Sequence, residues 1–177
     1  MFIKFLILFI FVIGVLGQSI LFAECLCITK AQQTSKGQDL EFETARCQLE
    51  SNLSECRNPE LGMKSITSLS QSNYPKAQYL MGYWYMIGRV DNKINYAMAL
   101  SLLTKASDHN VIAAYHDLGW LYETGNGTKL DLNTAEKLYL KAVSGGDIRG
   151  KLGLKRVELA RLKLQYPHAT KKKTGQL

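Results

Sequence analysis

One stretch of the chain occurs twice, and this repetition constrains its fold more than any other feature. "AQYLMGYWYMIG" from Ala77 and "AAYHDLGWLYETG" from Ala113 match at five positions, each pair 37 residues apart. A second matching stretch follows each copy at a spacing of 36 residues. Such a period, with two helix-length halves, is typical of α-helical solenoids, in which each helix pair buries its apolar face by stacking on the next pair. We therefore predict an all-α fold, a short right-handed α-solenoid of stacked antiparallel helix pairs with a C-terminal capping helix.

Small residues recur at fixed places in both copies. At 100° per residue, alanine, leucine or methionine, and tyrosine fall on one side of each first helix, which we assign to the core. Gly82 and Gly119 beside that side allow close helix approach, and Gly88 and Gly125 end the first helices in the left-handed conformation. The second helices are expected to end at Asn73, Asn110 and Gly146. The repeat-defining residues are Ala77, Met81, Gly82, Tyr85, Gly88, Ala106, Ala114, Leu118, Gly119, Tyr122, Gly125 and Ala142.

The pattern A-x-x-x-L-G-x-x-Y-x-x-G, followed by A-x-x-L-x-x-K-A, resembles the Sel-one-like repeat family, a relative of the tetratricopeptide repeats. The resemblance is strongest over residues 77–146. The first copy departs from it, because Met81 replaces leucine and the loop "GRVDNK" lacks the second glycine of "GNGT". The resemblance implies an α-solenoid that works as an adaptor or scaffold, commonly in bacterial envelopes or in host interaction.

Weaker copies extend the repeat domain to residues 58–165. Ile66 and Leu69 continue a preceding second helix, and residues 40–49 fit a degenerate first helix. At the other end, Lys155 and Glu158 replace the glycine and tyrosine of the pattern. A last helix with one polar side is what a terminal cap needs. We expect residues 166–177 to form a flexible basic tail.

The first 23 residues have the layout of a secretory signal peptide. One lysine precedes an apolar run from Phe5 to Leu16, and a more polar stretch ends at Ala23. An uncleaved membrane anchor is the alternative interpretation. Both predict an exported protein, secreted or periplasmic, with membrane contact through this segment only if it is uncleaved.

Residues 24–57 are rich in cysteine. In an oxidising compartment four thiols predict two disulfides, with three possible connectivities. We expect no metal site, because no C-x-x-C pair and no histidine at ligand spacing accompanies them. The predicted disulfide residues are Cys25, Cys27, Cys47 and Cys56.

The net charge of +7 is concentrated at the C-terminus. From Arg149 onward the chain carries nine lysines or arginines and one glutamate. This run is either a solvated face of the cap helix or a surface for weak contact with anionic lipid or an acidic partner. Because we predict export, we expect no nucleic-acid partner.

No catalytic constellation and no cofactor motif stands out. The three histidines are isolated, and no serine or cysteine lies at a nucleophile spacing. Because cysteine-rich members of the resembled family are associated with β-lactam binding, an enzyme acting on cell-wall or β-lactam substrates is the alternative function. "KTG" at Lys173 fits that signature, but no serine has a lysine three positions later. We predict a non-enzyme.

An aromatic stripe on the first helices is the predicted partner-binding surface. The same 100° arithmetic places it opposite the core side, where stacked repeats bring its residues together. Exposed apolar stripes tend to mark protein or peptide recognition sites. Two alternatives are that a neighbouring segment covers the stripe as ordinary core, and that the chain completes a larger assembly by stacking on another solenoid. The stripe consists of Tyr79, Tyr83, Met86, His116, Trp120 and Glu123.

Overall fold

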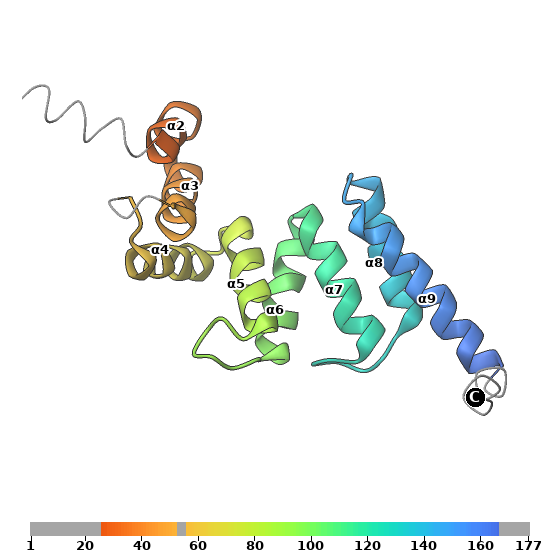
Figure 1. Ribbon diagram of the computed structural model, residues 1–177. Coiled ribbons are helices and arrows are strands. Elements are labelled where there is room, and N and C mark those ends of the chain that lie inside the picture. Colours follow the sequence, from red (N-terminus) through yellow and green to blue (C-terminus); the bar gives the residue numbers. More distant parts are fainter. Residues whose placement is uncertain (1–25, 53–55, 167–177) are drawn as a thin grey trace, which may run out of the picture. The chain divides into compact units, whose positions relative to one another are not determined.

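A computed structural model describes residues 26–52 and 56–166, and within these ranges the chain forms eight α-helices (Figure 1). The predicted signal segment lies outside the described residues. The chain divides into two compact units, Met1–Ser72 and Asn73–Leu177. The helices are α2 (Leu26–Thr34), α3 (Gly37–Glu50), α4 (Pro59–Gln71), α5 (Pro75–Ile87), α6 (Tyr96–Asp108), α7 (Ile112–Thr124), α8 (Leu132–Ser144) and α9 (Arg149–Gln165).

The first unit contains α2, α3 and α4, of which α3 packs against both others. The helix expected over residues 40–49 is present as α3, and its Ala45 is 1% exposed. Gly62 of α4 lies against it, so close that a Cβ there would be 2.8 Å from the Ala45 carbonyl oxygen. α2 was not predicted, because its short polar sequence buries little beyond Ala31.

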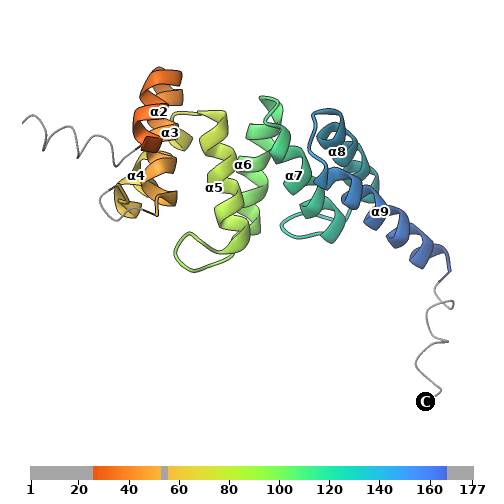
Figure 2. The ribbon, with the colours of Figure 1, turned by 45° about the horizontal axis from the view of Figure 1, so that its top comes forward.

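The second unit contains α5 to α9, packed in sequential pairs. α5 pairs with α6, α7 with α8, and α9 packs on α8, while α6 contacts α7 (Figure 2). The all-α fold of stacked helix pairs is thus confirmed. None of the helices in the described ranges is both long and apolar enough to cross a membrane.

The predicted helix ends are confirmed in both repeats. Gly88 (φ 74°) and Gly125 (φ 73°) end α5 and α7 in the left-handed conformation. Asn73 (φ 61°) and Asn110 (φ 59°) follow α4 and α6 in the same conformation, as does Gly146 (φ 94°) after α8. These residue types tolerate positive φ, so they set where each helix stops.

A side-chain hydrogen bond reinforces the turn before each first helix. Gln78 Nε2 donates to Asn73 Oδ1 at 3.1 Å. At the matched place in the next repeat, the Tyr115 hydroxyl donates to Asn110 Oδ1 at 2.8 Å. The left-handed asparagine therefore holds the following helix as well as ending the preceding one.

The core lies where the repeat pattern placed it, and glycines admit bulky side chains to it. A Cβ on Gly82 would lie 2.9 Å from Leu103 Cγ. Tyr139, which is 0% exposed, lies between Gly119 of α7 and Gly153 of α9, whose Cβ atoms would lie 2.9 and 2.5 Å from its ring. Other fully buried core residues are Ala77, Ala99, Ala106, Ala114, Leu121, Ala135 and Ala142.

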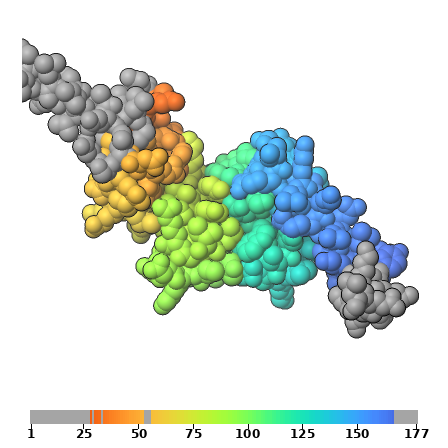
Figure 3. Space-filling model, viewed as in Figure 1, coloured from red at the N-terminus to blue at the C-terminus, as the bar shows by residue number. Residues whose placement is uncertain are grey.

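α9 buries one face and exposes another on which leucines stand among charged residues. Gly150, Gly153 and Val157 are buried. The prediction of a polar outer side is wrong in part, because leucines share that side with Lys155 and Glu158. The sequence reading considered only the positions in register with the repeat and missed those between them. In Figure 3, α9 (blue) lies uncovered at the surface of the second unit.

Candidate partner-binding surface

The predicted stripe lies on α5 and α7, which contact each other in the second unit. All six of its residues are half-buried: Tyr79, Tyr83, Met86, His116, Trp120 and Glu123. None is fully exposed, since neighbouring helices cover part of each side chain. The surface is therefore narrower than the sequence suggested, and its members play different roles.

Tyr79 and Tyr83 form the α5 part of the surface. Their rings stack with centroids 6.5 Å apart and an interplanar angle of 25°. Burial, and then the negative charge of Asp117, raise the pKa of Tyr79 to about 12. Tyr79 also packs against the core, and Tyr83, about one helical turn further along α5, stacks on the ring of Tyr79. The two rings therefore form a partly exposed aromatic surface, which the core contacts of Tyr79 hold in place.

His116 takes part in a polar cluster on α7. Its Nδ1 lies 2.8 Å from Asp117 Oδ1, and its ring is tilted against Tyr139 with centroids 5.6 Å apart. Asp117 is 3% exposed, and Arg149 Nη1 approaches the same Oδ1 to 3.7 Å. Within the described residues, Asp117 Oδ2 has no hydrogen-bond partner. His116 is therefore oriented by its own neighbours.

Arg149, which begins α9, is fixed mainly by Asp147. Its Nη2 lies 2.6 Å from Asp147 Oδ2, and its backbone N–H donates to Asp147 Oδ1 at 3.0 Å. The hydrogen bond from Arg149 holds the pKa of the Asp147 carboxyl below its usual range. This arrangement brings positive charge beside the buried carboxylate of Asp117.

Trp120 and Met86 are anchored by the apolar core. Both pack against the core cluster shared by α6 and α7. The Trp120 ring also lies 6.0 Å from that of Tyr96, at an angle of 52°. Trp120 thus has a buried side and an exposed side, which is the arrangement of an aromatic anchor at a protein interface.

Glu123 does not face outward, which corrects the sequence-based placement. Arg156 of α9 donates to it through Nε at 2.8 Å and Nη2 at 2.9 Å. The Tyr139 hydroxyl also donates to Glu123, and Arg156 Nη2 contacts that hydroxyl at 2.9 Å. Burial, and then the hydrogen bond to Glu123, raise the pKa of Tyr139. Repeat arithmetic missed this contact because Arg156 lies 33 residues away, outside the repeat register.

Arginines of α9 that contribute to the predicted basic surface are engaged inside the fold. Arg156 pairs with Glu123, Arg149 with Asp147, and Arg161 Nη2 with Glu136 at 2.8 Å. From the sequence these arginines were distinguishable only as positive charge. The signal that could have identified the network is an acid at a position where the first repeat has an apolar residue, as at Asp117 and Glu123.

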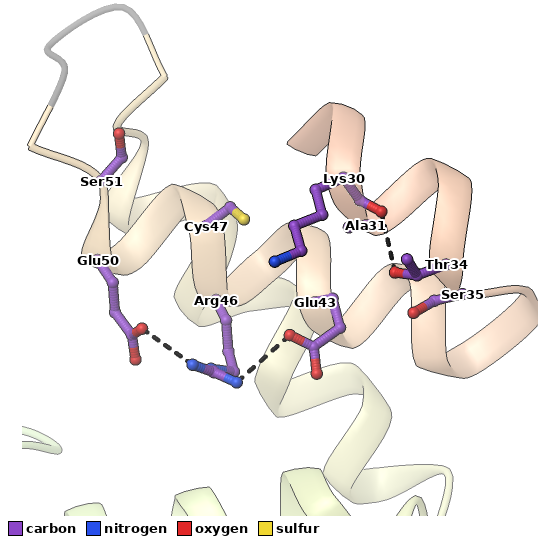
Figure 4. Close-up of a pocket in the computed structure, with 9 residues that line it drawn as sticks. All are labelled: Lys30, Ala31, Thr34, Ser35, Glu43, Arg46, Cys47, Glu50 and Ser51. Atoms are coloured by element: carbon purple, nitrogen blue, oxygen red, sulfur yellow. Dashed lines mark hydrogen bonds and ion pairs between the residues drawn. The ribbon is translucent and has the colours of Figure 1, made fainter. Parts of the chain in front are cut away.

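The first unit has a polar hollow between α2 and α3 (Figure 4). Arg46 bridges Glu43 at 3.3 Å and Glu50 at 3.2 Å. Figure 4 shows Lys30 reaching from α2 toward α3 above these charges. Because this ion-pair group is partly exposed, it contributes little to stability.

The predicted disulfides remain a prediction. Cys47 is half-buried beside the hollow and Cys56 is 4% exposed. The side chains of Cys25 and Cys27 lie outside the described residues. In the part of the chain that the structure describes, no group of three or more histidine, cysteine or acidic residues is arranged to hold a metal ion. "KTG" at Lys173 also lies outside that part.

Comparisons with known proteins place the fold. The Sel1 repeat family model matches residues 75–111 and 112–147. A Sel1 repeat protein from Oxalobacter formigenes has a similar structure, with a TM-score of 0.59 and 22% identity over 78% of this chain and 97% of that one. A protective antigen of uropathogenic Escherichia coli with an SLR fold gives a TM-score of 0.55 and 18% identity, over 80% of this chain and 36% of that one. No curated protein sequence matches.

The stacked helix pairs define the class as a tetratricopeptide-like α-solenoid. Within it, residues 75–111 and 112–147 each match the model of the Sel1 repeat. This fold is typically non-catalytic, and Sel1 repeats generally mediate protein binding.

Proposed function

We propose that this protein is an exported, non-catalytic scaffold that binds a protein or peptide partner through α5 and α7. The observation that carries the proposal is the partly exposed aromatic surface of Tyr79, Tyr83 and Trp120. Tyr79 and Trp120 pack against the core, and Tyr83 stacks on Tyr79. Rigid aromatic side chains lose little conformational entropy on binding, so they supply much of the energy at protein interfaces. The general role of Sel1 repeats supports the same function.

Site-specific photocrosslinking in the producing cell tests the surface. A photoreactive phenylalanine at position 83 should capture a defined partner, whereas the same group at Met98 of α6, which is 42% exposed, should not. Tyr83→Ala should reduce partner recovery about tenfold, as expected for an interface hot spot, and leave thermal melting unchanged. Equal capture from both positions would contradict this assignment.

Export is supported by the layout of residues 1–23 and by the cysteines that follow them. Fractionation followed by N-terminal sequencing tests it. The expected mature chain begins at Glu24, or keeps residues 1–23 in the membrane fraction if the segment is an anchor. Retention of the full chain in the cytoplasm would overturn the exported part of the proposal.

The non-catalytic part has a separate test. The purified protein should hydrolyse neither a chromogenic β-lactam nor a cell-wall peptide. Turnover that a single point substitution abolishes would establish the alternative, an enzyme acting on such substrates.

A further inference from the structure

The exposed side of α9 combines apolar side chains with lysines. Leu152 is 61% exposed, Leu159 51% and Leu162 46%, and Tyr166 just beyond the helix is 57% exposed. At 100° per residue these four, with Ile148, fall within one arc of about 80° opposite the buried residues. Large apolar side chains aligned on one face are unusual on a surface that only meets water.

The exposed arc is not needed to hold α9 against the rest of the second unit. α9 is already held on its other side by Gly150, Gly153 and Val157, and by the pairing of Arg156 with Glu123. At residue 155, where α5 and α7 have the glycine that lets a second helix pack closely, α9 has a lysine. The exposed arc is therefore not a truncated core surface awaiting the helix of a further repeat.

The charges on α9 indicate what the arc meets. Its arginines are engaged by acids of the second unit, which leaves Lys155 within the arc and Lys151 and Lys163 at its two edges. Within the described residues these lysines make no ion pair, and Glu158 is the sole acid of the helix. Three more lysines, at 171–173, follow in the sequence. A surface that complements this side of α9 must therefore be both apolar and anionic.

We propose that α9 docks flat on an anionic lipid bilayer. The arc offers leucines and a tyrosine to the membrane interface, and the stems of the lysines within and beside it can cover apolar surface while their ammonium groups meet lipid phosphates. A second copy of the chain is a poorer occupant, because pairing two such helices would bring lysines against lysines. This inference is independent of the proposed partner surface on α5 and α7.

Hydrogen exchange of the full-length protein tests the docking locally. Residues 1–23 could bind any bilayer, so the readout is the exchange rate of backbone amides 155–166 rather than total binding. Phosphatidylglycerol vesicles should slow this exchange severalfold, whereas phosphatidylcholine vesicles should leave it unchanged. High salt should weaken the effect, because it screens the lysines.

Two variants locate the effect on the arc. Leu159→Glu with Leu162→Glu should abolish the slowing. Leu61→Glu with Met98→Glu, which replaces residues 44% and 42% exposed on other helices, should preserve it. Lys155→Gln with Lys163→Gln keeps every apolar contact and should reduce the slowing at least threefold, so the test survives if the double glutamate variant fails to fold.

Three outcomes would overturn the proposal. Equal slowing of amide exchange by phosphatidylcholine vesicles would show that the lysines do not select anionic lipid. Slowing that depends on protein concentration without vesicles would show that a second copy covers α9. Slowing by a soluble acidic peptide, with none from phosphatidylglycerol, would assign the arc to an acidic protein.

Discussion

The two repeats have the same pair of helices and share the glycines at 82 and 119 and at 88 and 125, but they differ in what joins each to the next helix. The first repeat joins α7 through an apolar cluster centred on Leu103. The second joins α9 through Tyr139, enclosed by two glycines, and through the pairing of Glu123 with Arg156. At the matched positions the first repeat has Met86 and Leu103 instead of Glu123 and Tyr139.

This difference separates two tasks that a repeat sequence performs. Periodic small and apolar residues determine the backbone, and they are common to both repeats. The polar substitutions in the second repeat determine which helix can follow it, because Glu123 and the Tyr139 hydroxyl both bond Arg156 of α9. We call these two sets of contacts joints. The joint between the first repeat and α7 is apolar and could accept other apolar helices, whereas the joint between the second repeat and α9 depends on particular side chains.

Removing the ring at the specific joint should have the largest effect. Tyr139→Ala deletes a fully buried aromatic side chain and leaves a cavity between α7 and α9, so we expect a loss of about 3–5 kcal/mol of unfolding free energy. Urea denaturation measures it. A loss under about 1 kcal/mol would show that α9 is not held through this ring.

Filling the space beside the ring should cost less. Gly153→Ala puts a Cβ 2.5 Å from the rigid Tyr139 ring, and overpacking of this kind typically costs about 1–3 kcal/mol. Gly82→Ala in the first repeat meets the more adaptable Leu103 and should cost less in the same assay. A larger loss of unfolding free energy for Gly82→Ala than for Gly153→Ala would contradict the distinction between the joints.

Breaking the ion pair should rank third. Arg156→Met leaves Glu123, whose side chain is 12% exposed, without its charged partner, and we expect a loss of about 1–2 kcal/mol. Arg161→Met on the same helix is the control, since both partners of its pairing with Glu136 are about 40% exposed and solvent screens their attraction, so it should cost less. Equal losses of unfolding free energy in the two variants would show that the burial of Glu123 does not strengthen its pairing with Arg156.

Alkaline pH should weaken the first repeat through Tyr79. Because the folded pKa of Tyr79 lies near 12, above its ordinary value of 10.0, the unfolded chain loses this proton first as pH rises. Its contribution to stability is full below pH 10 and is lost between pH 10 and 12. Tyr79→Phe should flatten the decline of unfolding free energy over that range. An unchanged slope would place the titration elsewhere.

Sequence alone predicted what is local or periodic. The helix ends at Gly88 and Asn110 and the close approach at Gly119 follow from residue type and spacing, because a left-handed turn or a helix crossing admits few residues. The contacts of Glu123 and Asp117 did not follow. They depend on arginines of α9 that lie outside the repeat register, and only the folded backbone brings them near.

The surfaces were predicted less well than the core for a related reason. A 100° projection separates two sides of an isolated helix, but a helix in a stack has neighbours on three sides. Trp120 is therefore half-buried rather than exposed. The apolar outer arc of α9 was readable from Leu152 and Leu159, yet comparison with the repeat pattern directs attention to the positions between them.

The enclosure of Tyr139 by glycines from two helices limits how the array can grow. Its hydroxyl and ring need α7 and α9 at once, so the second repeat and α9 can be inherited or transplanted only together. A new repeat spliced in after Ser144 would separate them, whereas one inserted at the turn before Ile112 would meet apolar surfaces on both sides. Lengthening of this solenoid is therefore expected from the interior, with the terminal block conserved as a single piece.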